Sequence, residues 1–246
     1  TKWTIDYENV TGYGRMAADG KLCKRNRLDP PNSGVKDGVL YMTAEQDDEA
    51  YYGGMFYTNG TMRYTYGLLE VSNIHPKGNG FWVATWTMSD KGPNNLASVE
   101  VDVDECYGAG TWVYGNTFSW PTSYGKSLGY KTLHVNNRFY SQDGRGLWMD
   151  FHTFGYEWDE ATIRFTADGV VYAEQDMQTD PRDIDAFCMP QLIRISLSTA
   201  SSEHGLPTQD PEEWANTASY IVDYCYVYQK EGQLLFINPD PTLNRA

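Results

Sequence analysis

Residues 98–107 alternate between two kinds of side chain, and this pattern restricts the fold more than any other stretch of the chain. Three valines occupy every second position from residue 99 to residue 103. Period-two alternation with β-branched residues indicates a strand with one buried face. A regular strand would then carry Glu100, Asp102 and Asp104 on its other face, with no lysine or arginine among them. Neighbouring like charges on one face repel one another, so an ordinary solvated surface is a poor explanation.

Glu105 breaks this alternation. In a regular strand its side chain would point to the valine face, where burying a charge is very costly. A β-bulge after Asp102 would reverse the facing of the residues that follow and return Glu105 to the acidic face. We therefore predict a bulge here, with Glu100, Asp102 and Glu105 facing one way.

Three carboxylates on one face have a chemical use. Cleavage of a glycosidic bond with retention needs an ionised carboxylate as nucleophile and a protonated one as acid/base, about 5–5.5 Å apart. A carboxylate between them raises the pKa of its neighbour. Counted as about four strand steps, the Cα atoms of Glu100 and Glu105 are roughly 13 Å apart. Their side chains must therefore lean together, which a concave strand permits.

The rest of the chain reads as short strands separated by glycine and proline turns. Strands are predicted over residues 39–44, 64–74, 81–88, 130–135, 149–158, 162–173, 193–198 and 220–229, with a hairpin turn at Asp168-Gly169. Residues 1–35 and 107–126 are expected to be irregular, and residues 210–214 to start a helix of about two turns. The pattern predicts one all-β sandwich domain that spans residues 1–246.

Composition excludes several classes of partner. The net charge of −14 over 246 residues argues against nucleic acid, whose binding relies on lysine and arginine. No apolar run approaches the ~18 residues that a membrane span needs. The four cysteines lack the paired spacing of a zinc site, and their disulfide state stays open; they are Cys23, Cys106, Cys188 and Cys225.

Several stretches resemble glycoside hydrolase family 16. Glu-x-Asp-x-x-Glu at residues 100–105 is similar to the active-site signature of the bulged branch, which includes laminarinases, agarases, carrageenases and related endo-galactanases. Residues 80–86 resemble the Gly-x-Trp-x-Ala-x-Trp strand beside the catalytic strand, and residues 66–70 resemble a Tyr-Gly-x-x-Glu strand. The resemblance spans roughly residues 50–229.

The resemblance implies a β-jelly roll of two curved antiparallel sheets with an open concave cleft. It also implies roles for the acids: Glu100 is the expected nucleophile, Glu105 the acid/base, and Asp102 the carboxylate that orients and tunes the pair. An open cleft admits a polymer in mid-length, so endo action is expected.

The resemblance also points to residues outside the acidic strand. Trp82 and Trp86 share a face and are expected to bind sugar rings, and His134 falls where laminarinase-like members place a cleft histidine. No catalytic metal or other cofactor is expected. Many members hold a structural calcium away from the cleft, and Asp223 is the matching position here.

We expect a retaining endo-β-glycanase, with a β-1,3-glucan or mixed-linkage β-glucan as substrate. The alternative is an endo-β-galactanase acting on agar, porphyran, carrageenan or a mucin-type glycan. The 19 basic residues against 33 acidic ones favour a neutral polymer. A non-catalytic carbohydrate-binding module would keep the aromatic residues and lose the acids, so it is the weaker rival. The enzyme is expected to be extracellular and monomeric, without insertion into a membrane.

Overall fold

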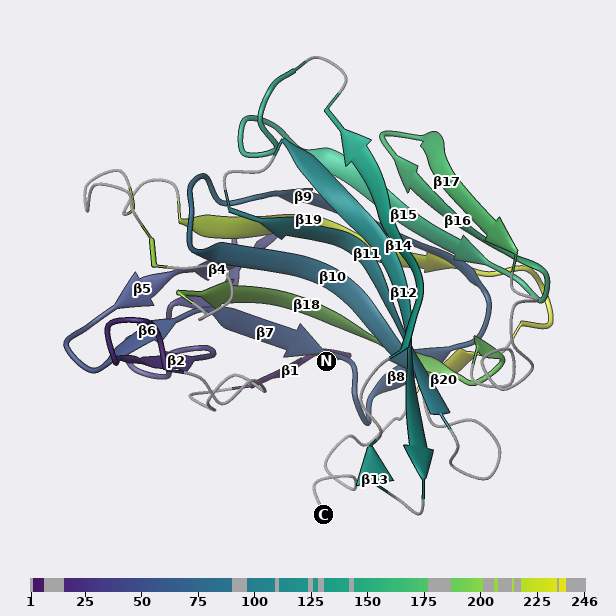
Figure 1. Cartoon of the computed structure of the whole chain (residues 1–246), viewed down its shortest axis with the longest axis horizontal. Coiled ribbons are helices and arrows are strands. Elements are labelled where there is room, and N and C mark those ends of the chain that lie inside the picture. The colour runs from purple at the N-terminus through teal and green to yellow at the C-terminus, as the bar shows by residue number, and fades with distance from the viewer. Residues whose placement is uncertain are drawn as a thin grey trace.

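The computed structural model describes two large, curved antiparallel sheets and almost no helix (Figure 1). The described residues are 2–6, 16–89, 97–108, 111–123, 126–127, 131–141, 144–176, 187–200, 206–207, 214, 218–233 and 235–237. At residues 121–123, 126–127, 131–136 and 236–237 the description covers the backbone alone.

The ten-stranded sheet holds the acidic strand near its middle. Its main path runs β1 (Thr4–Ile5), β7 (Gly54–Tyr57), β18 (Gln191–Thr199), β10 (Phe81–Ser89), β11 (Ala97–Tyr107), β12 (Trp112–Ser123) and β13 (Lys126–Ser127). β14 (Lys131–Tyr140) pairs with β12, while β8 (Met62–Tyr64) pairs with β18 and with β20 (Leu235–Ile237).

The seven-stranded sheet lies against one face of the ten-stranded sheet. Its order is β17 (Val170–Asp176), β16 (Thr162–Ala167), β15 (His152–Trp158), β9 (Gly67–Ile74), β19 (Ser219–Tyr228), β4 (Val39–Thr43) and β3 (Ser33–Lys36). A small third sheet has the order β2 (Leu22–Lys24), β6 (Ala50–Tyr52) and β5 (Glu45–Gln46).

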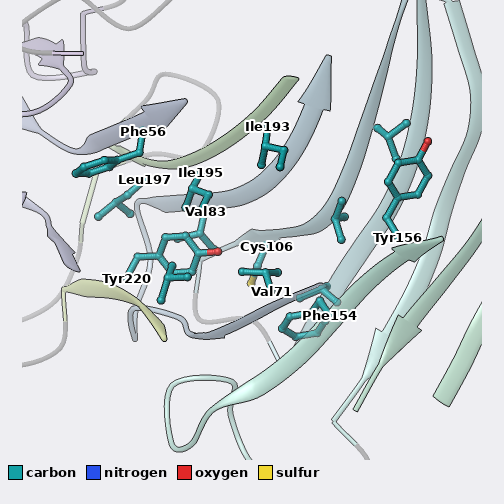
Figure 2. Close-up of a cluster of buried hydrophobic side chains, with 14 of the residues drawn as sticks. Phe56, Val71, Val83, Cys106, Phe154, Tyr156, Ile193, Ile195, Leu197 and Tyr220 are labelled. Carbon is teal, nitrogen blue, oxygen red and sulfur yellow. The ribbon is translucent and has the colours of Figure 1, made fainter. Parts of the chain in front are cut away.

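The core fills the space between the two large sheets (Figure 2). β10 and β11 of the ten-stranded sheet contribute Val83 and Cys106, and β9, β15 and β19 of the seven-stranded sheet contribute Val71, Phe154 and Tyr220. Alternate residues of each strand point inward, as expected for two packed sheets. This arrangement confirms the predicted jelly roll and leaves the far face of the ten-stranded sheet free to carry a site.

Local predictions have mixed outcomes. Asp168 and Gly169 form the predicted hairpin turn, with φ values of 49° and 77°. The prediction of an irregular connection over residues 107–126 is wrong, because β12 lies there and pairs with both β11 and β14. Its glycine and proline weaken the strand pattern, and ladder pairing on both sides compensates. Residues 1–35 likewise contain β1, β2 and the start of β3.

The next predictions concern the helix, the cysteines, a membrane span and the number of domains, and the structure tests them only within the described residues. Of the helix predicted at residues 210–214, only Trp214 is described, and its indole N–H donates to the carbonyl of Ala44 at 2.8 Å. The four cysteines are not bonded to one another. Within the described ranges, no helix has the length and apolar character that crossing a bilayer requires. The one-domain assignment stays a prediction.

Candidate active site

A cleft of about 390 Å³ crosses the ten-stranded sheet on the face that points away from the seven-stranded sheet. Its lining comes from five neighbouring strands, β7, β18, β10, β11 and β12, and from Arg25, which directly follows β2. The five strands lie side by side in Figure 1. Glu100, Asp102 and Glu105 all line this cleft, and so do Trp82 and Trp86. The structure therefore brings together five of the six predicted site residues.

The β-bulge predicted after Asp102 is present. Between β10 and β11, Trp86 pairs with Asp102 and Thr85 with Asp104, so Val103 is left without an opposite residue. The register of β11 against β12 shifts over the same interval, from Asp102 to Glu105. The extra residue returns Glu105 to the cleft face, as its position in the sequence required.

Glu105 is held by several donors. The indole N–H of Trp82 donates to its Oε1 at 2.9 Å, and the side-chain amide of Asn116 donates to its Oε2 at 3.0 Å. Tyr107 and Asp102 also form hydrogen bonds with this carboxyl group. These contacts fix the orientation of Glu105 from β10, β11 and β12, three neighbouring strands of the cleft.

Glu100 has fewer partners. The indole N–H of Trp120, on β12, donates to its Oε2 at 2.9 Å. Its pKa is raised to about 7, mainly by burial and also by the charge of Glu105, while the Trp120 hydrogen bond and the charge of Arg194 limit the rise. Near neutral pH both the protonated and the ionised forms of this carboxyl group are therefore populated.

The three acids titrate as a group, because each affects its neighbours. Burial raises the pKa of Asp102 well above its ordinary range, and the charges of Glu105 and Glu100 add to that effect. Burial also raises the pKa of Glu105, against hydrogen bonds that lower it. Protons in such a cluster belong to the set of carboxyl groups rather than to one residue. The set keeps at least one proton near neutrality, as acid catalysis requires.

Asp104 lies on the opposite face of β11. Without the bulge it would join the cleft acids; with it, the side chain points into the core and is fully buried. The backbone N–H of Thr85 donates to its Oδ1 at 2.6 Å, and Tyr220 donates to its Oδ2 at 3.3 Å. Nδ2 of Asn73 donates to the same Oδ2, and Nε2 of His75 lies 3.3 Å from it. Sequence patterning did not predict this cluster.

Both tryptophans line the cleft, yet their surroundings differ. The Trp82 indole is engaged by Glu105, as described above. The Trp86 indole N–H donates to Oγ of Ser196 at 3.1 Å, and the guanidinium of Arg194 lies 4.4 Å from the centre of its ring. One face of Trp86 is thus covered by a cation, and a sugar would have to stack on the other face.

The remaining predicted residue is less well placed. His134 is part of β14, where its backbone pairs with Thr117, and its side chain lies outside the described part of the chain. A cleft role for His134 stays a prediction.

Sequence reasoning missed several residues that line the cleft or contact the acids: Arg25, Tyr107, Asn116, Trp120 and Arg194. Asn116 and Trp120 lie within residues 107–126, where the sequence pattern predicts an irregular connection and therefore gives no facing for their side chains. Arg194 alternates with Ile193 and Ile195 in a predicted strand, and that alternation was the available signal.

The calcium prediction concerns Asp223. Asp223 is exposed at a bulge of β19. No group of three or more potential metal-ligating side chains occurs among the described residues. Calcium prefers six to eight oxygen ligands, usually with several carboxylates. A structural calcium at Asp223 stays a prediction.

Comparisons with known proteins agree with this geometry. The family model described as glycosyl hydrolases family 16 matches residues 26–226. A β-glucanase of Rhodothermus marinus is 26% identical over 246 residues, covering 93% of this chain and 79% of that protein.

Solved structures show the same fold. A laminarinase from Flavobacterium sp. UMI-01 superposes with a TM-score of 0.69 at 20% identity, covering 93% of both chains. A structure from work on endo-acting O-glycanases, with which human gut microbiota initiate mucin breakdown, superposes with a TM-score of 0.72. It is 20% identical, with 94% of this chain and 85% of that one covered. Because the family model spans most of the sequence and includes the acidic strand, the chain belongs to the glycosyl hydrolases of family 16.

Proposed function

We propose that this glycoside hydrolase cleaves internal linkages of a glycan with a β-1,3-linked glucan backbone, by double displacement with retention. The observation that carries the proposal is the bulged strand, which presents Glu100, Asp102 and Glu105 together in one cleft. The cleft crosses five strands of the sheet, an arrangement suited to a polymer bound in mid-length.

In this mechanism Glu100 attacks the anomeric carbon while Glu105 gives its proton to the departing sugar oxygen. A covalent glycosyl-enzyme forms, and Glu105 then removes a proton from the water that hydrolyses it. Asp102 shares a hydrogen bond with Glu105 and is a third carboxyl group that can hold a proton in the site.

The assignment of Glu100 as nucleophile and Glu105 as acid/base, rather than the reverse, rests on the resemblance of the motif to the family signature. Trp120 and Arg194 both stabilise the anion of Glu100, as a nucleophile requires. The larger number of donors on Glu105 would by itself favour an ionised Glu105 in the free enzyme. Chemical rescue of the two alanine variants with azide would distinguish the two assignments.

The substrate proposal draws on the relatives. The Rhodothermus marinus relative is a β-glucanase, and the Flavobacterium neighbour is a laminarinase. A second candidate, an endo-acting galactanase or mucin-type O-glycanase, is favoured by the O-glycanase neighbour and by the arginines at one end of the cleft. A non-catalytic module is disfavoured, since it would have no use for three buried acids.

We also propose that the enzyme acts outside the cell, where polysaccharides occur, and that it works as a monomer. The reaction as written needs no cofactor. A structural calcium remains a proposal that rests on the family resemblance alone.

A polysaccharide panel tests the proposal. Laminarin and mixed-linkage β-glucan should release reducing sugar, with viscosity falling early because cuts are internal. The Glu100→Ala variant should be inactive, whereas Glu174→Gln, on the exposed surface of β17, should keep full activity. Rapid cleavage of a neutral galactan and none of a β-glucan would overturn the substrate. No cleavage of any polymer would favour the binding-module alternative.

A further inference from the structure

We propose that Arg194 and Arg25 form an anion-binding subsite at one end of the cleft, which takes an oxyanion substituent of the glycan. The substituent is a sulfate ester or the carboxylate of a uronic acid. This inference rests on the proposed glycan hydrolysis and adds to it a preference for acidic substituents.

Arg194 lies in a row of residues that crosses the sheet. On β18 it pairs with Trp86 of β10, which pairs with Asp102 of β11. The strands β18, β10 and β11 lie side by side in Figure 1. Directly paired residues of antiparallel strands point to the same face, so Arg194 shares the cleft face with Asp102. Two strand spacings of about 4.8 Å separate their backbones by roughly 10 Å. An anionic group bound at Arg194 would therefore sit on a sugar beside the cleaved linkage.

Among the described residues, no carboxylate forms a direct ion pair with the guanidinium of Arg194, although the charges of Glu100 and Asp6 act on it without contact. Its one contact within the described ranges is with the Trp86 ring, 4.4 Å from the ring centre; no hydrogen-bond acceptor or carboxylate is bonded to it there. Arg25 differs, because its Nη1 lies 3.1 Å from Oδ2 of Asp6 and also contacts the sulfur of Met55. Within the described ranges, Asp6 is thus the one carboxylate in direct ion-pair contact with either arginine.

The two cations also act on each other. Burial lowers the pKa of Arg194, and the charge of Arg25 lowers it further; the charge of Glu100 opposes them less strongly. Placing two guanidinium groups together in a partly buried cleft is unfavourable in the free protein. A ligand anion would relieve that repulsion, and the planar guanidinium fork matches the oxygens of a carboxylate or sulfate.

A simpler role for Arg194 would be to serve as counter-ion of Glu100. That role is a minor one, because burial, Trp120 and Glu105 each change the pKa of Glu100 more than Arg194 does. The acidic balance of the whole chain does not exclude an anionic ligand either. The positive charge is confined to one end of the cleft, and the catalytic acids lie two strands away.

Matched substrates test the preference. A β-glucan that the enzyme cleaves is compared with the same polymer after partial oxidation to uronic acid, and after partial sulfation. The wild-type enzyme should show a kcat/KM at least about tenfold higher on one substituted polymer than on its parent, and the arm that responds identifies the substituent. In Arg194→Gln that ratio should fall about tenfold, while in Arg164→Gln, an arginine on β16 outside the cleft, it should stay unchanged.

The opposing outcomes are distinct. Equal rates on substituted and parent polymers would overturn the inference and leave the proposed function standing. A loss in Arg194→Gln that is the same on every substrate would show that Arg194 serves the catalytic acids instead.

A direct binding measurement tests the anion-binding subsite even if the enzyme cleaves none of the polymers. Inorganic sulfate, titrated at constant ionic strength against chloride, should change the tryptophan fluorescence saturably in the wild type and in Arg164→Gln but not in Arg194→Gln. Absence of a saturable change in the wild type would contradict the subsite whatever the activity. Thermal unfolding of each variant checks that the fold is kept.

Discussion

The two faces of β11 both carry buried carboxylates, but they differ in how many hydrogen-bond partners surround each one. Glu105 faces the cleft and Asp104, its direct neighbour in sequence, faces the core. Asp104 is completely enclosed, and four groups from three other strands and one loop surround it. The cleft acids have four side-chain donors for three carboxyl groups, against four groups around the single carboxyl of Asp104, and burial raises the pKa of each cleft acid.

The contrast separates a structural carboxylate from reactive ones. A buried charge that is fully hydrogen-bonded holds a structure together, whereas an incompletely compensated one is kept for chemistry. Asp104 also binds the backbone N–H of Thr85, which lies directly opposite it beside the bulge. The structural acid on one face therefore fixes the bulge that places Glu105 on the other.

The largest expected effect is on activity. Glu100→Ala should lower kcat by at least about 10³-fold, because the nucleophile is lost, and the protein should stay folded because a repulsive charge is removed. With an activated aryl β-glycoside and azide, this variant should form the α-glycosyl azide, detectable by NMR. Formation of the α-azide by Glu105→Ala, and not by Glu100→Ala, would exchange the two roles.

The core face should show the reverse behaviour, with stability as the main loss. Asp104→Asn removes the charge that accepts four contacts, and unpaired buried donors should cost about 2–4 kcal/mol of unfolding free energy. Urea unfolding measures the loss, with Asp150→Asn on the surface as the control expected to change less than about 0.5 kcal/mol. An unchanged midpoint for Asp104→Asn would remove the distinction between the two faces.

A smaller effect concerns pH. The pKa of Glu100 is about 7 in the folded state against an ordinary value of 4.5, so the folded state binds more protons between these pH values. Stability should therefore fall as pH rises from about 4.5 to 7, by roughly 3 kcal/mol at most for this group. Glu100→Gln should flatten that part of the profile and be more stable than the wild type at pH 8. Parallel profiles for the two proteins would contradict the shifted pKa.

The smallest effect concerns sugar binding. Trp86 lines the cleft and has one ring face against Arg194, so its other face is the one available to a sugar and Trp86→Ala should weaken substrate affinity roughly tenfold, about 1.4 kcal/mol. The dissociation constant of an oligosaccharide for an inactive Glu100→Ala background provides the measurement. No change in affinity would mean that Trp86 supports Arg194 rather than the sugar.

The sequence predicted the acidic face of β11 well, because alternation and the cost of burying Glu105 both depend on local order. It also predicted that Trp82 and Trp86 share a face. It did not predict what crosses between strands: Trp120 reaches Glu100 from a segment that lacks a clear strand pattern, and Arg194 reaches the cleft through sheet order. The partners of Asp104 come from β9, β10, β19 and the loop after β9, and no local pattern joins such distant residues.

The stereochemistry of the first-formed product tests the central claim most directly. If the bulge brings Glu100 and Glu105 within about 5–5.5 Å, hydrolysis proceeds with retention. Proton NMR during the first minutes of β-glucan cleavage should then show the β anomer of the new reducing end, with the α anomer appearing only as mutarotation proceeds. An initial α anomer would require carboxyl groups about 6.5–9.5 Å apart, with water as the attacking group. It would contradict both the nucleophile role of Glu100 and the geometry assigned to the bulge.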